Sequence, residues 1–166
     1  PKYLIDIDLA KNIFLKFLNF QTNYKKKSNV KSEIKLINDN LIFDYIKFTE
    51  DKNSIIINSL QLDSKNEIKS ISSIDVQTFN DNIENNNFEI SFKDKIFITG
   101  KKYDSTNLLK QLTNDSKLNP LKNFTNNIEI KLDNLITKSR IPLKDFALIG
   151  QIKKGKFEKL SAKSEF

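Results

Sequence analysis

The stretch SNVKSEIKLINDNLIFDYIKFTEDKNSIIINSLQL, residues 28–62, decides the fold class. In its first part, apolar residues such as Val30, Ile34 and Leu36 alternate with charged ones. This two-residue period is typical of a β-strand with one buried face. Residues 38–40 then read Asn-Asp-Asn, residue types that tolerate the positive φ angles of a tight hairpin turn. The stretch therefore predicts a strand, a turn and a second strand, with a third strand after the next polar residues.

The same alternation recurs along most of the chain. Strand starts follow one another about every 12 to 15 residues, as in a β-meander whose neighbouring strands are antiparallel. We therefore expect a mainly β fold without a domain boundary. The other alternating or apolar runs are residues 3–9, 68–79, 88–92, 128–132, 146–152 and 157–166.

Two further runs have a less regular pattern. The apolar phase of residues 68–79 shifts between Ile71 and Ile74, which predicts a β-bulge. Residues 10–20 fit both a strand and one face of a helix, and we favour the strand.

One short helix is expected near residues 104–113. Asp104 or Ser105 can cap its first turn, and Leu108 and Leu109 then fall on one face. A helix of this length is not stable alone in water, so we expect it to pack against the sheet.

The basic charge of the chain is spread out rather than clustered. Lys and Arg number 28 against 21 Asp and Glu, for a formal net charge of +7, and Arg140 is the only arginine. Arginine is the preferred residue for phosphate forks and base edges, so we do not expect a nucleic-acid partner. The one tight run, Lys25 to Lys27, is more typical of a solvated turn than of a phosphate clamp.

The residue types of most catalytic and metal sites are missing. The chain has no His and no Cys, which removes the usual general base, the triad partner and thiolate metal ligands. Asp6 and Asp8 share one face of a strand, roughly 7 Å apart, a spacing that an inverting glycosidase can use. Ordinary solvated strand faces carry the same pattern, and we favour that interpretation. We therefore expect no catalytic residue, no metal and no cofactor.

The segment FEISFKDKIFITGKKYDSTNLLKQL, residues 88–112, resembles a known pattern. It is similar to the strand–Gly–x–x–x–Asp–x–x–x–Leu–Leu segment of the AsmA-like, YhdP-type envelope proteins, which are related to TamB. Gly100, Asp104, Leu108 and Leu109 stand at the positions of that pattern. The order of the other strands matches as well, so the resemblance covers most of the chain.

The resemblance implies an elongated, curved antiparallel β-meander, or β-groove, of about 9 to 11 strands. Such proteins are anchored in the inner membrane, span the periplasm and are thought to conduct phospholipid towards the outer membrane. The chain begins at Pro1 and contains no Met, so we expect residues 1–166 to be a single middle segment of a longer protein. Its partners would be phospholipid acyl chains and neighbouring β-groove segments of the same chain. The membrane anchor would lie in a part not present here.

The apolar sides of the strands would line this groove. The alternative that the residues leave open is a structural or adhesive β-domain with a dry core. The residues expected to contact acyl chains are Ile5, Ile7, Ile34, Leu36, Phe43, Tyr45, Phe88, Ile90, Phe92, Ile128, Ile130, Leu132, Phe146 and Leu148.

Overall fold

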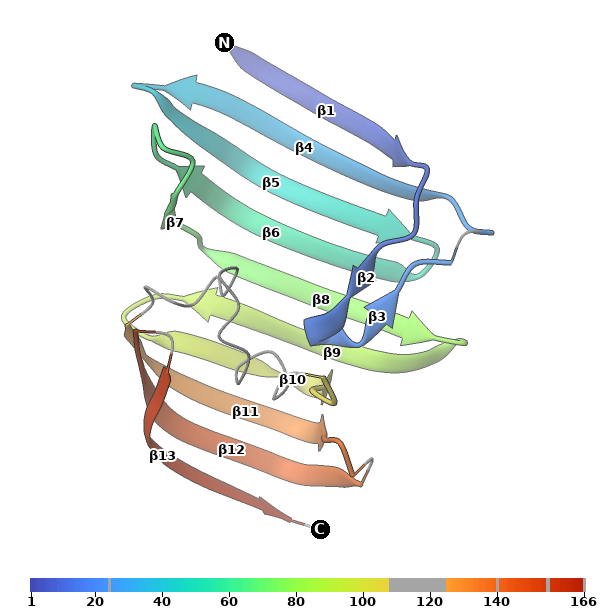
Figure 1. The fold of residues 1–166 in the computed structure, drawn as a ribbon, viewed down its shortest axis with the longest axis vertical. Helices are drawn as coiled ribbons and strands as arrows, with labels where there is room; N and C mark the ends of the chain where they lie inside the picture. The colour runs from blue at the N-terminus through green and yellow to red at the C-terminus, as the bar shows by residue number, and fades with distance from the viewer. Residues whose placement is uncertain (24, 108–124, 140, 155, 166) are drawn as a thin grey trace.

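The computed structural model describes residues 1–23, 25–107, 125–139, 141–154 and 156–165, and its main feature is one large open β-sheet (Figure 1). The mainly β fold expected from the alternation is confirmed. The chain ends lie at opposite ends of the sheet, so the long axis runs across the strands (Figure 1). In spatial order the strands are β1 (Lys2–Leu9), β4 (Ser28–Ile37), β5 (Asn40–Glu50), β6 (Asn53–Leu62), β8 (Ser73–Asn80), β9 (Ile83–Phe92), β10 (Ile96–Asp104), β11 (Asn126–Ile136), β12 (Pro142–Lys153) and β13 (Lys156–Glu165), and β7 (Ile68–Ser70) pairs with β6.

Asparagine and aspartate make the tight turns of this sheet. Asn38 and Asp39 have φ angles of 48° and 59°, and the residues that flank them pair directly across the hairpin. Asp81 and Asn82 do the same between β8 and β9, with φ angles of 49° and 66°. The predicted hairpin at residues 38–40 is confirmed, and the chain makes these turns without glycine.

One strand pair differs from the expected antiparallel meander. β10 and β11 are parallel, with Ile96 beside Ile128 and Asp104 beside Ile136. Every other strand pair among the described residues is antiparallel. Alternation within a strand is the same in both arrangements, so the sequence pattern did not reveal the parallel pair.

The helix expected near residues 104–113 falls mostly outside the described part of the chain. Asp104 is the last residue of β10, and Thr106 and Asn107 form a turn. Residues 108–113, including Leu108 and Leu109, lie outside the described residues.

Residues 10–23 leave the main sheet and lie against one of its faces; we call them the cover segment. They contain β2 (Phe14–Leu15), the 3₁₀ turn η1 (Lys16–Leu18) and β3 (Phe20–Gln21), and β2 pairs with β3 in a separate two-stranded sheet. Asn19 has a left-handed φ of 47°, which lets the chain reverse between η1 and β3. The expected single strand over 10–20 is therefore wrong. In Figure 1 the cover segment crosses in front of β8 and β9.

The run 68–79 contains a break instead of a bulge. β7 ends at Ser70 and β8 begins at Ser73, and both pair with β6. The amide of Ser72 in the break donates to the carbonyl of Asn58 at 3.1 Å, so the chain stays attached to the sheet there.

The hydrophobic core lies between the sheet and the cover segment. Leu18 and Phe20 of the cover segment are 0% and 1% exposed and pack with Val76, Phe88 and other residues of the sheet. A second cluster is formed by β10, β11 and β12 near the other end of the strands. Among the described residues, no helix has the length and apolar character needed to cross a membrane.

Candidate functional site

A continuous row of apolar side chains crosses the whole sheet at right angles to the strands; we call it the central row. Its members are direct pairing partners from each strand to the next, so their side chains lie on one face. Most of them are half-buried isoleucines. The row consists of Ile5, Ser32, Ile46, Ile57, Ile74, Ile90, Ile98, Ile130, Leu148 and Ala162.

Ser32 is the one polar member of the central row. Its side chain is buried, and its hydroxyl donates to the main-chain carbonyl of Tyr45 at 2.7 Å. The hydroxyl hydrogen is therefore used inside the protein. A molecule lying along the row meets alkyl groups over nearly all of its length.

Two further rows flank the central row on the same face. The covered row runs on the side of the cover segment, which buries its members Val76, Phe88 and Leu132. The outer row lies on the other side, in two parts. The covered row is Ile7, Val30, Phe48, Ile55, Val76, Phe88, Gly100, Leu132 and Phe146. The outer row is Tyr3, Ile34, Phe43 and Leu60, and then Phe92, Ile96, Ile128 and Gly150.

Thirteen of the fourteen residues expected to line a groove lie on this apolar face. The central row holds Ile5, Ile90, Ile130 and Leu148, the covered row holds Ile7, Phe88, Leu132 and Phe146, and the outer row holds Ile34, Phe43, Phe92 and Ile128, while Leu36 pairs with Leu41 just beyond.

Tyr45 is the exception, because it lies on the opposite face. It pairs with Glu33 and Asn58, and the Asn58 amide donates to Asp75 on that face. The register shifts beside Asp44, so Ile46 instead of Tyr45 continues the apolar face. The bulge breaks the two-residue period on which the prediction for Tyr45 depended.

The opposite face carries a contrasting row of mostly polar side chains; we call it the polar row. Lys131, for example, shares Glu129 with Lys95 in an ion-paired group. The two lysines hold the pKa of Glu129 down, to about 2. The polar row is Asp6, Lys31, Lys47, Ile56, Asp75, Glu89, Thr99, Lys131, Ala147 and Lys163.

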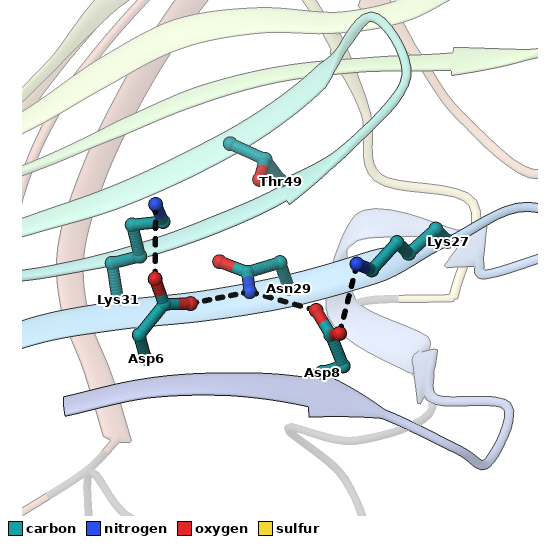
Figure 2. A pocket seen from close by; sticks show the side chains of 6 residues that line it. All are labelled: Asp6, Asp8, Lys27, Asn29, Lys31 and Thr49. Atoms are coloured by element: carbon teal, nitrogen blue, oxygen red, sulfur yellow. Dashed lines mark hydrogen bonds and ion pairs between the residues drawn. The ribbon is translucent and has the colours of Figure 1, made fainter.

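Asp6 and Asp8 form a charge network on this polar face (Figure 2). The side-chain amide of Asn29 lies between the two carboxylates and donates to Asp6 at 2.7 Å and to Asp8 at 3.0 Å. Lys31 pairs with Asp6 at 3.1 Å, and Lys27 pairs with Asp8 at 2.9 Å.

These contacts keep both carboxyl groups charged. The amide of Asn29 and then the ammonium of Lys31 lower the pKa of Asp6, and Lys27 followed by Asn29 lowers that of Asp8. The acid of an inverting glycosidase needs a raised pKa instead, so neither carboxyl group has the property that this acid requires. Among the described residues, no group of three or more acidic side chains is close enough to hold a metal ion.

The Lys25–Lys27 run is exposed at the turn before β4. Lys26 forms an ion pair with Asp51 at 2.9 Å, and Lys27 is the partner of Asp8 described above. Two of the three ammonium groups therefore point to carboxylates of the chain itself.

The cover segment is attached by polar contacts that the sequence did not reveal. The side-chain amide of Asn86 donates to the Leu18 carbonyl at 2.7 Å, and the Tyr103 hydroxyl donates to the Phe17 carbonyl at 3.0 Å. Asn86 is fully buried. Burial removes solvent from Tyr103 and raises the pKa of its hydroxyl above the ordinary value, so this group stays a hydrogen-bond donor.

Residues 80–87 look like a turn in the sequence, because they are rich in Asn and Asp. The register shift between Thr78 and Phe79 instead leaves Asn85 and Asn86 both buried in the sheet. Three consecutive asparagines inside an otherwise alternating strand were the available signal.

Gly100 and Asp104 each have a definite structural role. A Cβ on Gly100 would lie 2.4 Å from the Asn87 carbonyl oxygen and 2.5 Å from the Phe88 Cα, so the close approach of β9 and β10 excludes a side chain there. The Asp104 carboxylate accepts a hydrogen bond from the Asn19 side chain at 2.8 Å. The two residues therefore help to shape and hold the covered side of the apolar face.

Comparisons with protein-family models, with curated proteins and with solved structures gave no significant match to this chain.

Proposed function

We propose that this chain is a segment of a periplasm-spanning protein that conducts phospholipid between the inner and outer membranes, with acyl chains sliding along the apolar face of its sheet. The membrane anchor of such a protein would lie outside these residues. The proposal is supported by the central row, which runs without interruption across ten strands. The resemblance of residues 88–112 to the AsmA-like, YhdP-type pattern favours the same function.

The length of the central row suits sliding better than binding at one place. Neighbouring strands are about 4.8 Å apart, so ten strands give a contour of about 40 Å. An acyl chain spans half of a hydrocarbon core that is about 30 Å thick, or about 15 Å. The row is therefore long enough for a chain to occupy several successive positions.

The chemistry of the row also fits an acyl chain. Burial of each CH₂ group stabilises the complex by about 0.8 kcal/mol, and this stabilisation needs no polar partner. Since successive positions offer similar alkyl surfaces, the free energy of the lipid changes little as it moves. Transport along the row then requires no catalytic residue.

Adjacent isoleucines on β6 provide a direct test. Ile57 belongs to the central row, and Ile56 belongs to the polar row on the opposite face. We would place p-benzoylphenylalanine at either position, add vesicles of phosphatidylethanolamine and phosphatidylglycerol, irradiate, and detect lipid adducts by mass spectrometry. Adducts are expected at Ile57 and not at Ile56. No adduct at Ile57, or equal yields at the two positions, would contradict the proposal.

The packing beneath the cover segment favours a second candidate, a structural or adhesive β-domain with a dry core. Leu18 and Phe20 are 0% and 1% exposed, as side chains in an ordinary protein core are. Native mass spectrometry of the purified chain separates the two candidates, because only the lipid-conducting segment is expected to retain phospholipid.

A further inference from the structure

The cover segment divides the apolar face into a sealed part and an accessible part. Val76, Phe88 and Leu132 of the covered row are 4%, 6% and 3% exposed. The apolar residues of the central row from Ile5 to Leu148 are only half-buried. The rest of the covered row is less protected, because Val30, Phe48, Ile55 and Phe146 are half-buried and Ile7 is 52% exposed. The sealed part therefore lies on strands β8 to β11.

Apolar packing fixes one side of this boundary. The Phe20 ring meets the Phe48 ring edge-on, with centroids 6.1 Å apart. Leu18 and Phe20 together cover Val76 and Phe88 on the strands beyond. A hydrocarbon chain could reach Val76 and Phe88 only by displacing these two side chains of the cover segment.

Hydrogen bonds hold the cover segment in place at several points. In addition to the Asn86 and Tyr103 bonds described above, the Asn80 side chain donates to the Asn19 carbonyl at 3.2 Å. At the other end, the Glu50 carboxylate accepts hydrogen bonds from the main-chain amide of Asn23 at 3.0 Å and from the Ser28 hydroxyl at 2.9 Å. Glu50 is 2% exposed, so opening the segment would expose the apolar pair and break bonds to buried polar groups at the same time.

We infer that the cover segment is a fixed wall that excludes the lipid from the covered row between β8 and β11 and confines the acyl chain there to the central and outer rows. This inference rests on the proposed function and adds the position of the chain on the apolar face. The lipid headgroup then lies towards the outer-row edge, because the cover segment closes the other edge.

The way in which the cover segment is inserted makes the inference testable. Leu9 and Ser28 pair directly across β1 and β4, on the two sides of the segment. At its base, the Thr22 amide donates to the Ile13 carbonyl at 3.0 Å, so the segment is closed on itself. Residues 10–27 can therefore be replaced by a short Asn-Gly turn while β1 and β4 keep their register.

Three positions on β9 sample the three rows. Phe88 lies in the covered row and is 6% exposed, whereas the half-buried Ile90 and Phe92 lie in the central and outer rows. With p-benzoylphenylalanine at each position in the intact chain and the vesicles described above, we expect lipid adducts at Ile90 and Phe92 and background yield at Phe88. In the chain with residues 10–27 replaced, the adduct yield at Phe88 should rise to that at Ile90.

The outcomes separate the inference from the function on which it rests. No adduct at any of the three positions contradicts the proposed function. Equal yields at Phe88 and Ile90 in the intact chain contradict the wall and leave the function standing. A background yield at Phe88 in the replaced chain, with the yield at Ile90 retained, also contradicts the wall.

A milder variant covers the case in which the replaced chain does not fold. Phe20→Ala keeps the backbone bonds of the cover segment and opens space beside Phe48. Phe20 and Phe88 belong to the same buried cluster, so adducts at Phe88 are expected to appear in this variant. Their absence while Ile90 still reacts would overturn the inference.

Discussion

Asn86 and Leu18 are 68 residues apart in the sequence, and the buried side-chain amide of Asn86 donates to the main-chain carbonyl of Leu18 at 2.7 Å. The same amide group donates to the Thr78 hydroxyl at 2.8 Å, and its oxygen accepts from the Asp104 amide at 2.9 Å. One side chain thus joins the cover segment to β8 and β10.

Replacing this side chain should loosen the cover segment. Asn86→Ala removes a partner from the buried Leu18 carbonyl, the buried Thr78 hydroxyl and the half-buried Asp104 amide. We therefore expect the free energy of unfolding to fall by about 2–4 kcal/mol. Trypsin cleavage after the exposed Lys16, inside the cover segment, should become faster. Urea unfolding and timed proteolysis measure the two effects. Asn87→Ala is the control, since Asn87 is only half-buried and bonds to Glu84; equal losses in both variants would contradict the special role of Asn86.

The covered and outer rows should differ in their contribution to stability. Phe88 is 6% exposed, and its ring centroid lies 4.7 Å from that of Tyr103. Phe88→Ala should therefore lower the free energy of unfolding by about 3–5 kcal/mol, the range for an aromatic side chain removed from a core. Phe43 is half-buried, so part of its surface is already in water. Phe43→Ala should therefore lower the free energy of unfolding by about half as much. Chemical denaturation of both variants tests this order, and a reversed order would show that the wall does not enclose the main core.

The two described glycines should respond differently to alanine. At Gly100 the added methyl group would meet the backbone of β9, which cannot move without breaking the strand pair, so we expect a loss of about 2–3 kcal/mol. At Gly150 the nearest atom is a terminal methyl of Leu160, an exposed side chain that can rotate away. Thermal unfolding should show a clear fall in Tm for Gly100→Ala and little change for Gly150→Ala. A similar fall for both would mean that β12 and β13 are packed as tightly as β9 and β10.

Stability should depend on pH through Glu129. Its hydrogen bonds with Lys131 and Lys95 lower its pKa from 4.5 to about 2 in the folded chain. The folded state therefore prefers the charged carboxylate, and this contribution is complete above pH 4.5 and is lost as the pH falls towards 2. Urea midpoints measured from pH 6 to pH 2 should fall less steeply for Glu129→Gln than for the unchanged chain. If the urea midpoints of the two proteins fall in parallel, Glu129 does not contribute to the pH dependence of stability.

Local signals in the sequence were enough to predict most strands and the hairpin turns. Alternation places Ile34 and Ile90 on one face without knowledge of their partners, and the Asn38–Asp39 pair identifies a turn by residue type alone. For the same reason, most of the apolar face could be predicted from the sequence. Lipid contact along that face remains a prediction.

The features that sequence reasoning missed depend on pairing across the sheet. The shift beside Asp44 moves Tyr45 to the polar face. Residues 41–48 are apolar at both even and odd positions, so the sequence of β5 alone does not show where the period changes. The path of residues 10–23 is set by burial of Leu18 and Phe20 against strands more than fifty residues away, which no local periodicity records. The parallel pairing of β10 with β11 has the same long-range origin.

That parallel pair also has a consequence for the order of folding. On either side of it, most neighbouring strands meet after short connections, whose closure costs little chain entropy, and β1 and β4, which are separated by residues 10–27, are the exception. β10 and β11 can meet only after the chain of residues 105–125 has brought the end of one strand back to the start of the other. Contacts of this kind form late, because the chain loses entropy when the two strands are brought together, before their pairing stabilises the sheet. We therefore expect the chain to fold as two blocks, residues 1–104 and residues 126–165, with the junction between β10 and β11 as the last part of the sheet to form and the first to separate.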